Sequence, residues 1–159
     1  MTNRVKITPM LRSLIESGLK SVEGEIFLSP PPSCPSCNSK LTGFDTVQRR
    51  FATLIRDGET ENIMVQVKRF QCLACKKVFP AIAPFYPETR YGKPVIDLVR
   101  ALLETNSANR VTVILREMGV FIDRGTVISY KKRDFDKIGV MDLFGFKIPI
   151  SVIELTTMS

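Results

Sequence analysis

The sequence contains no histidine. This absence excludes histidine-based catalysis and any metal site that mixes cysteine with histidine. The 159 residues also lack an apolar run near the roughly 18 residues that a membrane-crossing helix needs. Residues 1–20 lack the uninterrupted apolar stretch of a signal peptide. From these absences we expect a cytoplasmic protein that makes no membrane contact.

Acidic residues are fewer than basic ones. The chain has 23 Lys and Arg against 16 Asp and Glu, which gives a net charge of +7. Such an excess favours a polyanionic partner, although many ordinary soluble proteins share it. No internal repeat and no long polar tract are present, and 44% of the residues are hydrophobic. The chain can therefore bury one modest core or support two small modules joined by a linker.

Prolines mark two boundaries. Residues 29–33 read Ser-Pro-Pro-Pro-Ser, which is too proline-rich for a helix or a central strand, and residues 80–94 contain four prolines and a glycine. Ahead of the first boundary, Thr8 and Pro9 are typical of a helix start, and apolar residues follow at helical spacing. After the second boundary the apolar period changes from two to about 3.6 residues.

The four cysteines form two C-x-x-C pairs, Cys34 with Cys37 and Cys72 with Cys75. This spacing lets both thiolates of a pair reach one ion at about 2.3 Å, so four thiolates can close a tetrahedral shell. Soft ligands in this geometry favour Zn²⁺, with iron as the lesser option, and a closed shell indicates a structural metal. The alternative is two redox or disulfide pairs, but the sequence lacks the thioredoxin-like βαβ pattern that would support it.

The residues between the cysteine pairs predict a hairpin. Residues 47–55 and 63–70 are typical of strands, and residues 56–59 supply turn chemistry between them. The hairpin would return the second cysteine pair beside the first. Because so small a β unit has little apolar core, we expect its folding to depend on metal. Near the end of the chain, residues 144–155 also look like a strand, with nothing after it to pair against.

Residues 94–138 predict a helix-turn-helix. Gly119 can reverse the chain after a helix at 109–118, Asp123 can cap the next helix, and Val127 and Tyr130 would point to the core. A recognition helix needs such an inward face, small or polar outward residues and cations at its flank. The alternative is an ordinary three-helix bundle with a solvated basic end, since Gly125 weakens a helix by roughly 1 kcal/mol relative to Ala. The expected outward residues are Arg124, Gly125, Ile128, Ser129 and Lys132.

Residues 68–79 resemble the second zinc knuckle of insertion-sequence transposases. In that knuckle, a strand with basic and aromatic residues precedes the C-x-x-C pair, and a phenylalanine follows it. Residues 115–130 are similar to the helix-turn-helix by which those transposases hold their terminal inverted repeats. The resemblance covers residues 34–138. It implies zinc-dependent, sequence-specific DNA binding to element ends or to an operator, and hence a nucleoid-associated location.

The resemblance stops near the C-terminus. In that family a ribonuclease-H-like domain follows, whose carboxylates bind divalent metals for strand transfer. Residues 151–154 resemble its first strand, but Glu154 stands where an aspartate is expected and no later carboxylates follow. We therefore expect no enzyme activity from this chain, and interpret it as a truncated element, a separate DNA-binding subunit or a regulator. The expected partners are duplex DNA, a second copy of the chain and a separate catalytic transposase subunit.

Two other functions compete with DNA binding. Zinc ribbons also dock on RNA polymerase, and Asp57 and Glu59 are acids at the hairpin turn, although Gly58 separates them. A structural, protein-binding zinc module that dimerises through its helices is the other alternative.

The sequence predicts an α+β fold, a small β zinc ribbon followed by a three-helix helix-turn-helix domain. The expected regions are an N-terminal helical segment (1–29), the four-cysteine zinc ribbon (30–80), a linker (81–93), the helix-turn-helix (94–138) and a tail or start of a missing domain (139–159). The expected phosphate contacts are Lys68, Arg69, Lys76 and Lys77, the expected major-groove contacts are Arg124, Ser129 and Lys132, and the expected flanking cations are Lys131 and Arg133.

Overall fold

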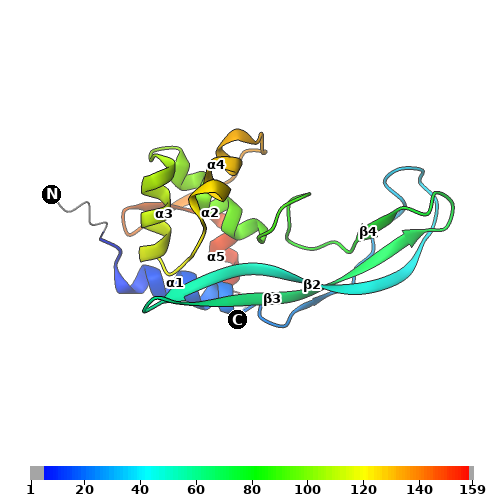
Figure 1. The fold of residues 1–159 in the computed structure, drawn as a ribbon, viewed down its shortest axis with the longest axis horizontal. Coiled ribbons are helices and arrows are strands. Elements are labelled where there is room, and N and C mark those ends of the chain that lie inside the picture. The colour runs from blue at the N-terminus through cyan, green and yellow to red at the C-terminus, as the bar shows by residue number, and fades with distance from the viewer. Residues whose placement is uncertain (1–5, 158–159) are drawn as a thin grey trace.

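The computed structural model describes residues 6–157 and has a mixed α+β fold. Helices gather at one end of the molecule, and a long two-stranded hairpin runs past them and continues as an arm (Figure 1). We call the helices and the adjoining half of the hairpin the body. The elements are α1 (Pro9–Lys20), β1 (Ile26–Phe27), β2 (Leu41–Arg56), β3 (Glu59–Cys72), β4 (Val78–Pro80), α2 (Lys93–Leu103), α3 (Ala108–Glu117), α4 (Arg124–Lys132), β5 (Val140–Leu143), β6 (Phe146–Pro149) and α5 (Ile150–Thr157).

The predicted hairpin is confirmed and is longer than expected. β2 and β3 pair antiparallel from Leu41 opposite Cys72 to Arg56 opposite Glu59. Their turn consists of Asp57 and Gly58, both at positive φ (52° and 78°), and such two-residue turns match the twist of the flanking strands. On its other edge, β3 pairs with β1 in parallel and with β4 antiparallel. The two ends of the hairpin therefore differ, with the turn at the body and the cysteines at the far end of the arm (Figure 1).

One hydrophobic cluster joins the hairpin to the helices. Phe51 on β2 and Ile63, Val65 and Val67 on β3 are buried with the inward faces of all five helices. The backbone of Gly92 donates to the carbonyl oxygen of Phe51 at 2.8 Å, and a Cβ at Gly92 would lie only 2.4 Å from the Phe51 ring. The expected regions 1–29, 30–80 and 94–138 thus contribute to one core.

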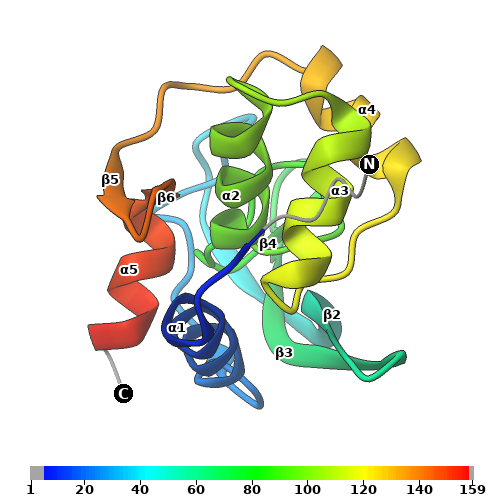
Figure 2. The same ribbon diagram turned by 90° about the vertical axis from the view of Figure 1, so that its left-hand side faces the viewer.

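The helix predictions before residue 133 are confirmed. The Thr8 hydroxyl accepts a hydrogen bond from Leu11 N–H at the start of α1, and Asp123 caps α4 by accepting from Thr126 N–H at 3.0 Å. Gly119 takes the positive φ of 87° that reverses the chain after α3. The helices α2, α3 and α4 all contact one another, and α1 lies beside α5 (Figure 2). None of the helices in residues 6–157 is both long enough and apolar enough to cross a membrane.

The expected strand over residues 144–155 is confirmed only for β6 (Phe146–Pro149), and the rest of the range is a turn and a helix. Phe144 and Gly145, with φ of 50° and 85°, form the turn between β5 and β6, so the strand partner precedes residue 146. The next residues form α5, because Pro149 lacks the backbone N–H that would donate a further ladder bond and a helix buries Val152 and Leu155 on one face. Residues 151–154 are therefore helical and do not form the first strand of a ribonuclease-H-like domain.

Candidate metal centre

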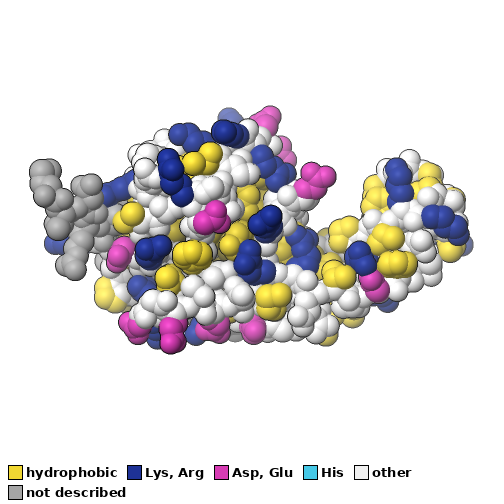
Figure 3. Space-filling view, in the orientation of Figure 1, with side chains coloured by type: hydrophobic (Ala, Val, Ile, Leu, Met, Phe, Trp, Pro, Cys, Tyr) yellow, Lys and Arg dark blue, Asp and Glu magenta, His cyan; other side chains and the backbone are white. Residues whose placement is uncertain are grey.

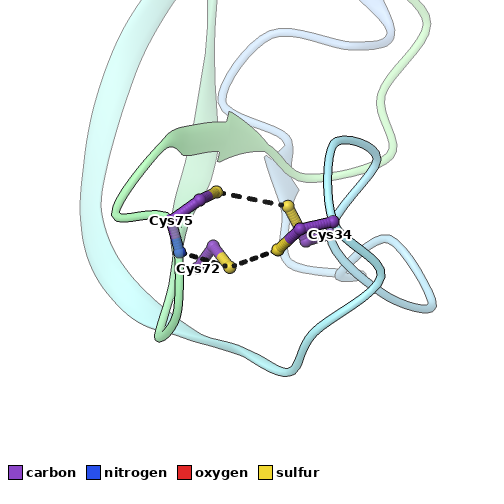
Figure 4. A group of neighbouring side chains, drawn as sticks. Cys34, Cys72 and Cys75 are labelled. Carbon is purple, nitrogen blue, oxygen red and sulfur yellow. Dashed lines mark hydrogen bonds between the residues drawn. The ribbon is translucent and has the colours of Figure 1, made fainter.

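The four cysteines meet at the tip of the arm. Cys34 and Cys37 lie in the loop before β2, and Cys72 and Cys75 lie at the end of β3 and in the turn after it (Figure 4). The Sγ atoms of Cys34 and Cys75 are 3.7 Å apart, those of Cys37 and Cys72 are 3.4 Å apart, and all four lie within 4.8 Å of one another. A tetrahedral ion with metal–sulfur distances of about 2.3 Å has sulfur–sulfur edges of about 3.8 Å. The donor set therefore fits one tetrahedral metal ion.

The two cysteine loops have the same backbone design. In the first, Cys34 N–H donates to Ser39 O at 2.9 Å and Asn38 N–H donates to Cys34 O at 2.8 Å. In the second, the corresponding distances are 2.9 Å from Cys72 N–H to Lys77 O and 3.1 Å from Lys76 N–H to Cys72 O. The residue after the second cysteine is left-handed in both loops, with φ of 65° and 66°. Each loop thus turns both of its thiols toward the same point.

The thiols have unequal acidities. The hydroxyl and the backbone N–H of Ser39 donate toward Cys37 and lower the pKa of its thiol to about 6. The backbone N–H of Lys77 lowers the pKa of Cys75, but burial and the three neighbouring thiols outweigh it and raise that pKa to about 11. Four thiolates this close repel one another unless a cation lies between them. Bound metal would therefore let all four ionise together.

The tip has little apolar core of its own. Cys34 and Cys72 are buried, at 2% and 0% exposed, whereas residues 42–46 of β2 are exposed. The donor set contains sulfur alone, so a bound ion has a closed thiolate shell, without the open position that metal-bound water would need. Such an ion acts by holding the two cysteine loops together.

The four cations on the arm that the sequence predicted as phosphate contacts differ in the partners of their side chains. Arg69 is neutralised by Asp45, to which its Nε donates at 2.6 Å in a two-point ion pair. Lys68 lies over the Phe70 ring at 5.4 Å, and Lys77 donates to the Ser36 hydroxyl at 3.1 Å. Among the described residues, only Lys76 of these four cations is exposed and without a side-chain partner.

The predicted contacts on α4 lie in the body, away from the cysteines (Figure 1). Arg133, just after α4, donates to the carbonyl oxygens of Pro87 and Glu88 at 3.0 and 3.3 Å. The structure therefore does not bring the two predicted sets of contacts together. The exposed α4 residues whose side chains have no hydrogen bond or ion pair with any other described residue are Arg124, Ser129, Lys131 and Lys132.

Sequence reasoning missed a third group of cations, where the hairpin leaves the body. Arg49 lies 3.9 Å from the centre of the Phe85 ring, Arg50 lies 4.7 Å from that of Tyr91, and Arg90 is exposed on the same loop. Figure 3 shows Lys and Arg side chains over the helices and again in this region. No sequence pattern indicates this group of cations, because β2 and the loop before α2 are distant in sequence.

A comparison with protein families finds one family model, which matches residues 34–115 and so covers both cysteine pairs, the hairpin, α2 and most of α3. Searches of curated proteins and of solved structures find no match. The matched segment spans more than half of the chain, and the protein therefore belongs to the family described as Domain of unknown function (DUF6431).

Proposed function

We propose that this protein binds duplex DNA sequence-specifically, reading bases with α4 as the second helix of a helix-turn-helix. The observation that best supports this proposal is the distribution of buried and exposed side chains on α4. Its inward residues Val127 and Tyr130 are buried, while Arg124, Ser129 and Lys132 are exposed and have no side-chain hydrogen bond or ion pair with other described residues. Guanidinium, hydroxyl and ammonium groups are donors suited to base edges in a major groove.

The turn between α3 and α4 supports this role because it is braced. Ile55 N–H donates to Gly119 O at 2.9 Å, and Phe121 N–H donates to Thr53 O at 2.8 Å, so the turn is attached to the edge of β2. Arg12 from α1 adds a hydrogen bond of 3.0 Å to Ile55 O. A helix that reads bases must be held in one orientation by its scaffold.

The cysteine tip supplies the second contact in this proposal. Zn²⁺ is the ion that an all-thiolate tetrahedral set favours, and it would order Lys76 and Lys77 next to the metal loops. Their contacts would be with phosphates and would not depend on sequence. DNA bound in this way would span the arm and the helices.

The resemblance to insertion-sequence transposases suggests the biological setting. We propose that the chain recognises element ends or an operator, without catalysis of its own, and acts with a second copy or with a separate catalytic subunit. Such a DNA-binding protein would be found at the nucleoid.

A protein-binding zinc module is the second candidate. A groove of about 820 Å³ opens between the segment after α1, the loop before α2 and α5, and apolar side chains form most of its wall. Among them are Phe27, Ile82, Phe85 and Leu155. The polymerase-adaptor alternative has less support, because the turn at Asp57 and Gly58 is tied to α1 by the Arg56–Glu16 ion pair of 3.4 Å.

The test is selection from a random pool of duplex DNA by the zinc-loaded protein at moderate salt, followed by sequencing. We expect one defined motif to be enriched. Arg124→Ala should relax the motif, whereas Lys77→Ala should weaken binding to selected and random DNA alike. Arg56→Ala, at the opposite end of the hairpin, is the control for loss of one charge. Unenriched DNA with wild-type protein, or equal losses on both DNAs for Arg124→Ala, would contradict the proposal.

A further inference from the structure

Three arginines from separate parts of the chain lie around the loop of residues 84–92, next to the end of α4. Arg50 comes from β2, Arg90 from the loop before α2, and Arg133 from the end of α4. We call these residues the arginine cluster. They come together because the loop of residues 84–92 is fastened to both neighbours. Gly92 N–H donates to Phe51 O at 2.8 Å on the hairpin side.

Two of the arginines are held in place by the structure. The Arg50 guanidinium lies over the ring of Tyr91, which is buried. Arg133 donates to the carbonyl oxygens of Pro87 and Glu88 and lies 4.8 Å from the centre of the Phe135 ring. Neither guanidinium forms an ion pair with a carboxylate of the described residues. Both therefore keep their positive charge available and partly pre-ordered.

Arg90 is the accessible member of the cluster. Its side chain is exposed and makes no hydrogen bond or ion pair with any described residue. Arg90 interacts electrostatically with Asp123, whose pKa it helps to lower. Asp123 is already engaged at the start of α4, where it accepts from Thr126 N–H and from the Thr126 hydroxyl at 2.6 Å.

The Tyr130 hydroxyl faces the same region and lacks a partner. Tyr130 is 5% exposed, and its hydroxyl makes no hydrogen bond with the described residues. No fully buried side-chain oxygen or nitrogen of these residues is left unbonded, so this hydroxyl opens to solvent. Burial and nearby Tyr91 raise the pKa of Tyr130 to about 12, although Arg133, Arg90 and Arg50 act in the opposite direction. The hydroxyl is therefore protonated at neutral pH and free to donate.

We infer that the arginine cluster and the Tyr130 hydroxyl together bind one phosphate of the DNA backbone. Guanidinium groups match phosphate oxygens in geometry and in charge, and a buried tyrosine adds a neutral donor. The site lies beside α4, so a phosphate held there would fix how that helix enters the groove. This inference rests on the proposed DNA binding and adds Arg50, Arg90 and Tyr130 to the contacts that the sequence predicted.

The experiment compares Arg90→Gln and Tyr130→Phe with the control Arg56→Gln in the zinc-loaded protein. Affinity is measured on the selected duplex and on a random duplex over a range of salt concentrations. Arg90→Gln should weaken binding to both duplexes by roughly three- to tenfold and reduce the salt slope by about 0.9, as for one lost phosphate contact. Tyr130→Phe should weaken binding with an unchanged salt slope, because it removes a neutral donor. Unfolding temperatures identify any variant whose fold is damaged.

A duplex series with single neutral methylphosphonate linkages locates the phosphate. One substitution should weaken wild-type binding but have no further effect on Arg90→Gln, because both changes remove the same contact. If the wild-type protein fails to bind DNA at all, the proposed function itself is wrong. If it binds and both variants match Arg56→Gln, only this inference is overturned. Stabilisation by inorganic phosphate that needs Arg90, with unchanged DNA affinity in Arg90→Gln, would also overturn it in favour of a free-anion site.

Discussion

The backbone N–H of Phe121 donates a hydrogen bond of 2.8 Å to the carbonyl oxygen of Thr53. Thr53 lies on β2, whose other end leads to the cysteine tip, and Phe121 lies in the turn that leads into α4. Val120 forms a β-bridge with Leu54 beside it. One strand therefore supports both the metal loops and the helix that we propose to read DNA.

Removal of the metal should unfold the cysteine tip and leave the body folded. The four unshielded thiols repel once ionised, and residues 42–46 have few apolar contacts to replace the lost ligation. After chelation, the backbone amides of residues 42–48 should exchange their hydrogens rapidly, and those of residues 52–55 should exchange slowly. Cys37→Ser should resemble chelation, while Ser36→Ala should not. Loss of protection throughout the chain would show instead that the body depends on the metal.

Immediately after metal removal, while the cysteine loops still keep their folded backbone, Cys37 should be alkylated before Cys75. Both side chains are exposed, but at pH 7 Cys37, with a pKa of about 6, is mostly thiolate, whereas Cys75, with a pKa of about 11, is mostly thiol. The thiolate is the nucleophile that attacks iodoacetamide and displaces iodide. The Cys37 rate should fall as the pH drops below about 6, and the Cys75 rate should rise as the pH approaches 11.

Peptide mass spectrometry measures both alkylation rates. Ser39→Ala should slow Cys37 at pH 7, because the Ser39 hydroxyl is the main cause of its low pKa. Equal rates at the two cysteines from the first time point, or an initial Cys37 rate unaffected by Ser39→Ala, would disagree with this assignment, whereas rates that become equal later report the unfolding of the tip.

Gly92→Ala should destabilise the protein by about 1–3 kcal/mol, the usual range for an overpacked core. The new methyl group would lie 2.4 Å from the Phe51 ring, and Phe51 is fully buried. The matched control is Gly43→Ala, where the added carbon meets only the flexible end of Lys68, at 3.2 Å. Urea denaturation measures both variants. Phe51→Leu in the Gly92→Ala background should recover part of the loss by making room, and no coupling between the two changes would speak against the clash.

Ser151→Ala should loosen α5 and cost about 2 kcal/mol, as expected for a hydrogen bond to a charged group. The Ser151 hydroxyl donates to Oδ2 of buried Asp97 on α2 at 2.6 Å, and the Tyr86 hydroxyl donates to Oδ1. Cleavage by a glutamate-specific protease after Glu154 should be faster in this variant. Ser129→Ala, at an exposed serine on α4, is the control, and equal cleavage of both would show that Asp97 does not hold α5.

The sequence by itself determined the features that depend on a few neighbouring residues. The cysteine spacing predicted two metal loops, residues 56–59 predicted the hairpin turn, and Thr8, Gly119 and Asp123 predicted where helices begin or end. Each of these signals reflects a local preference in φ, in capping or in side-chain period. These features can be predicted without knowledge of the residues that pack against them.

Only the tertiary structure decided how distant segments meet. Residues 150–157 became a helix because α1 and α2 offer a surface that buries Val152 and Leu155. Arg69 is neutralised because strand pairing places Asp45 opposite it. Arg50, Arg90 and Arg133 form a cluster because a loop is fastened between β2 and α4. Such contacts join residues dozens of positions apart, and their free energy exists only after the chain between them has folded.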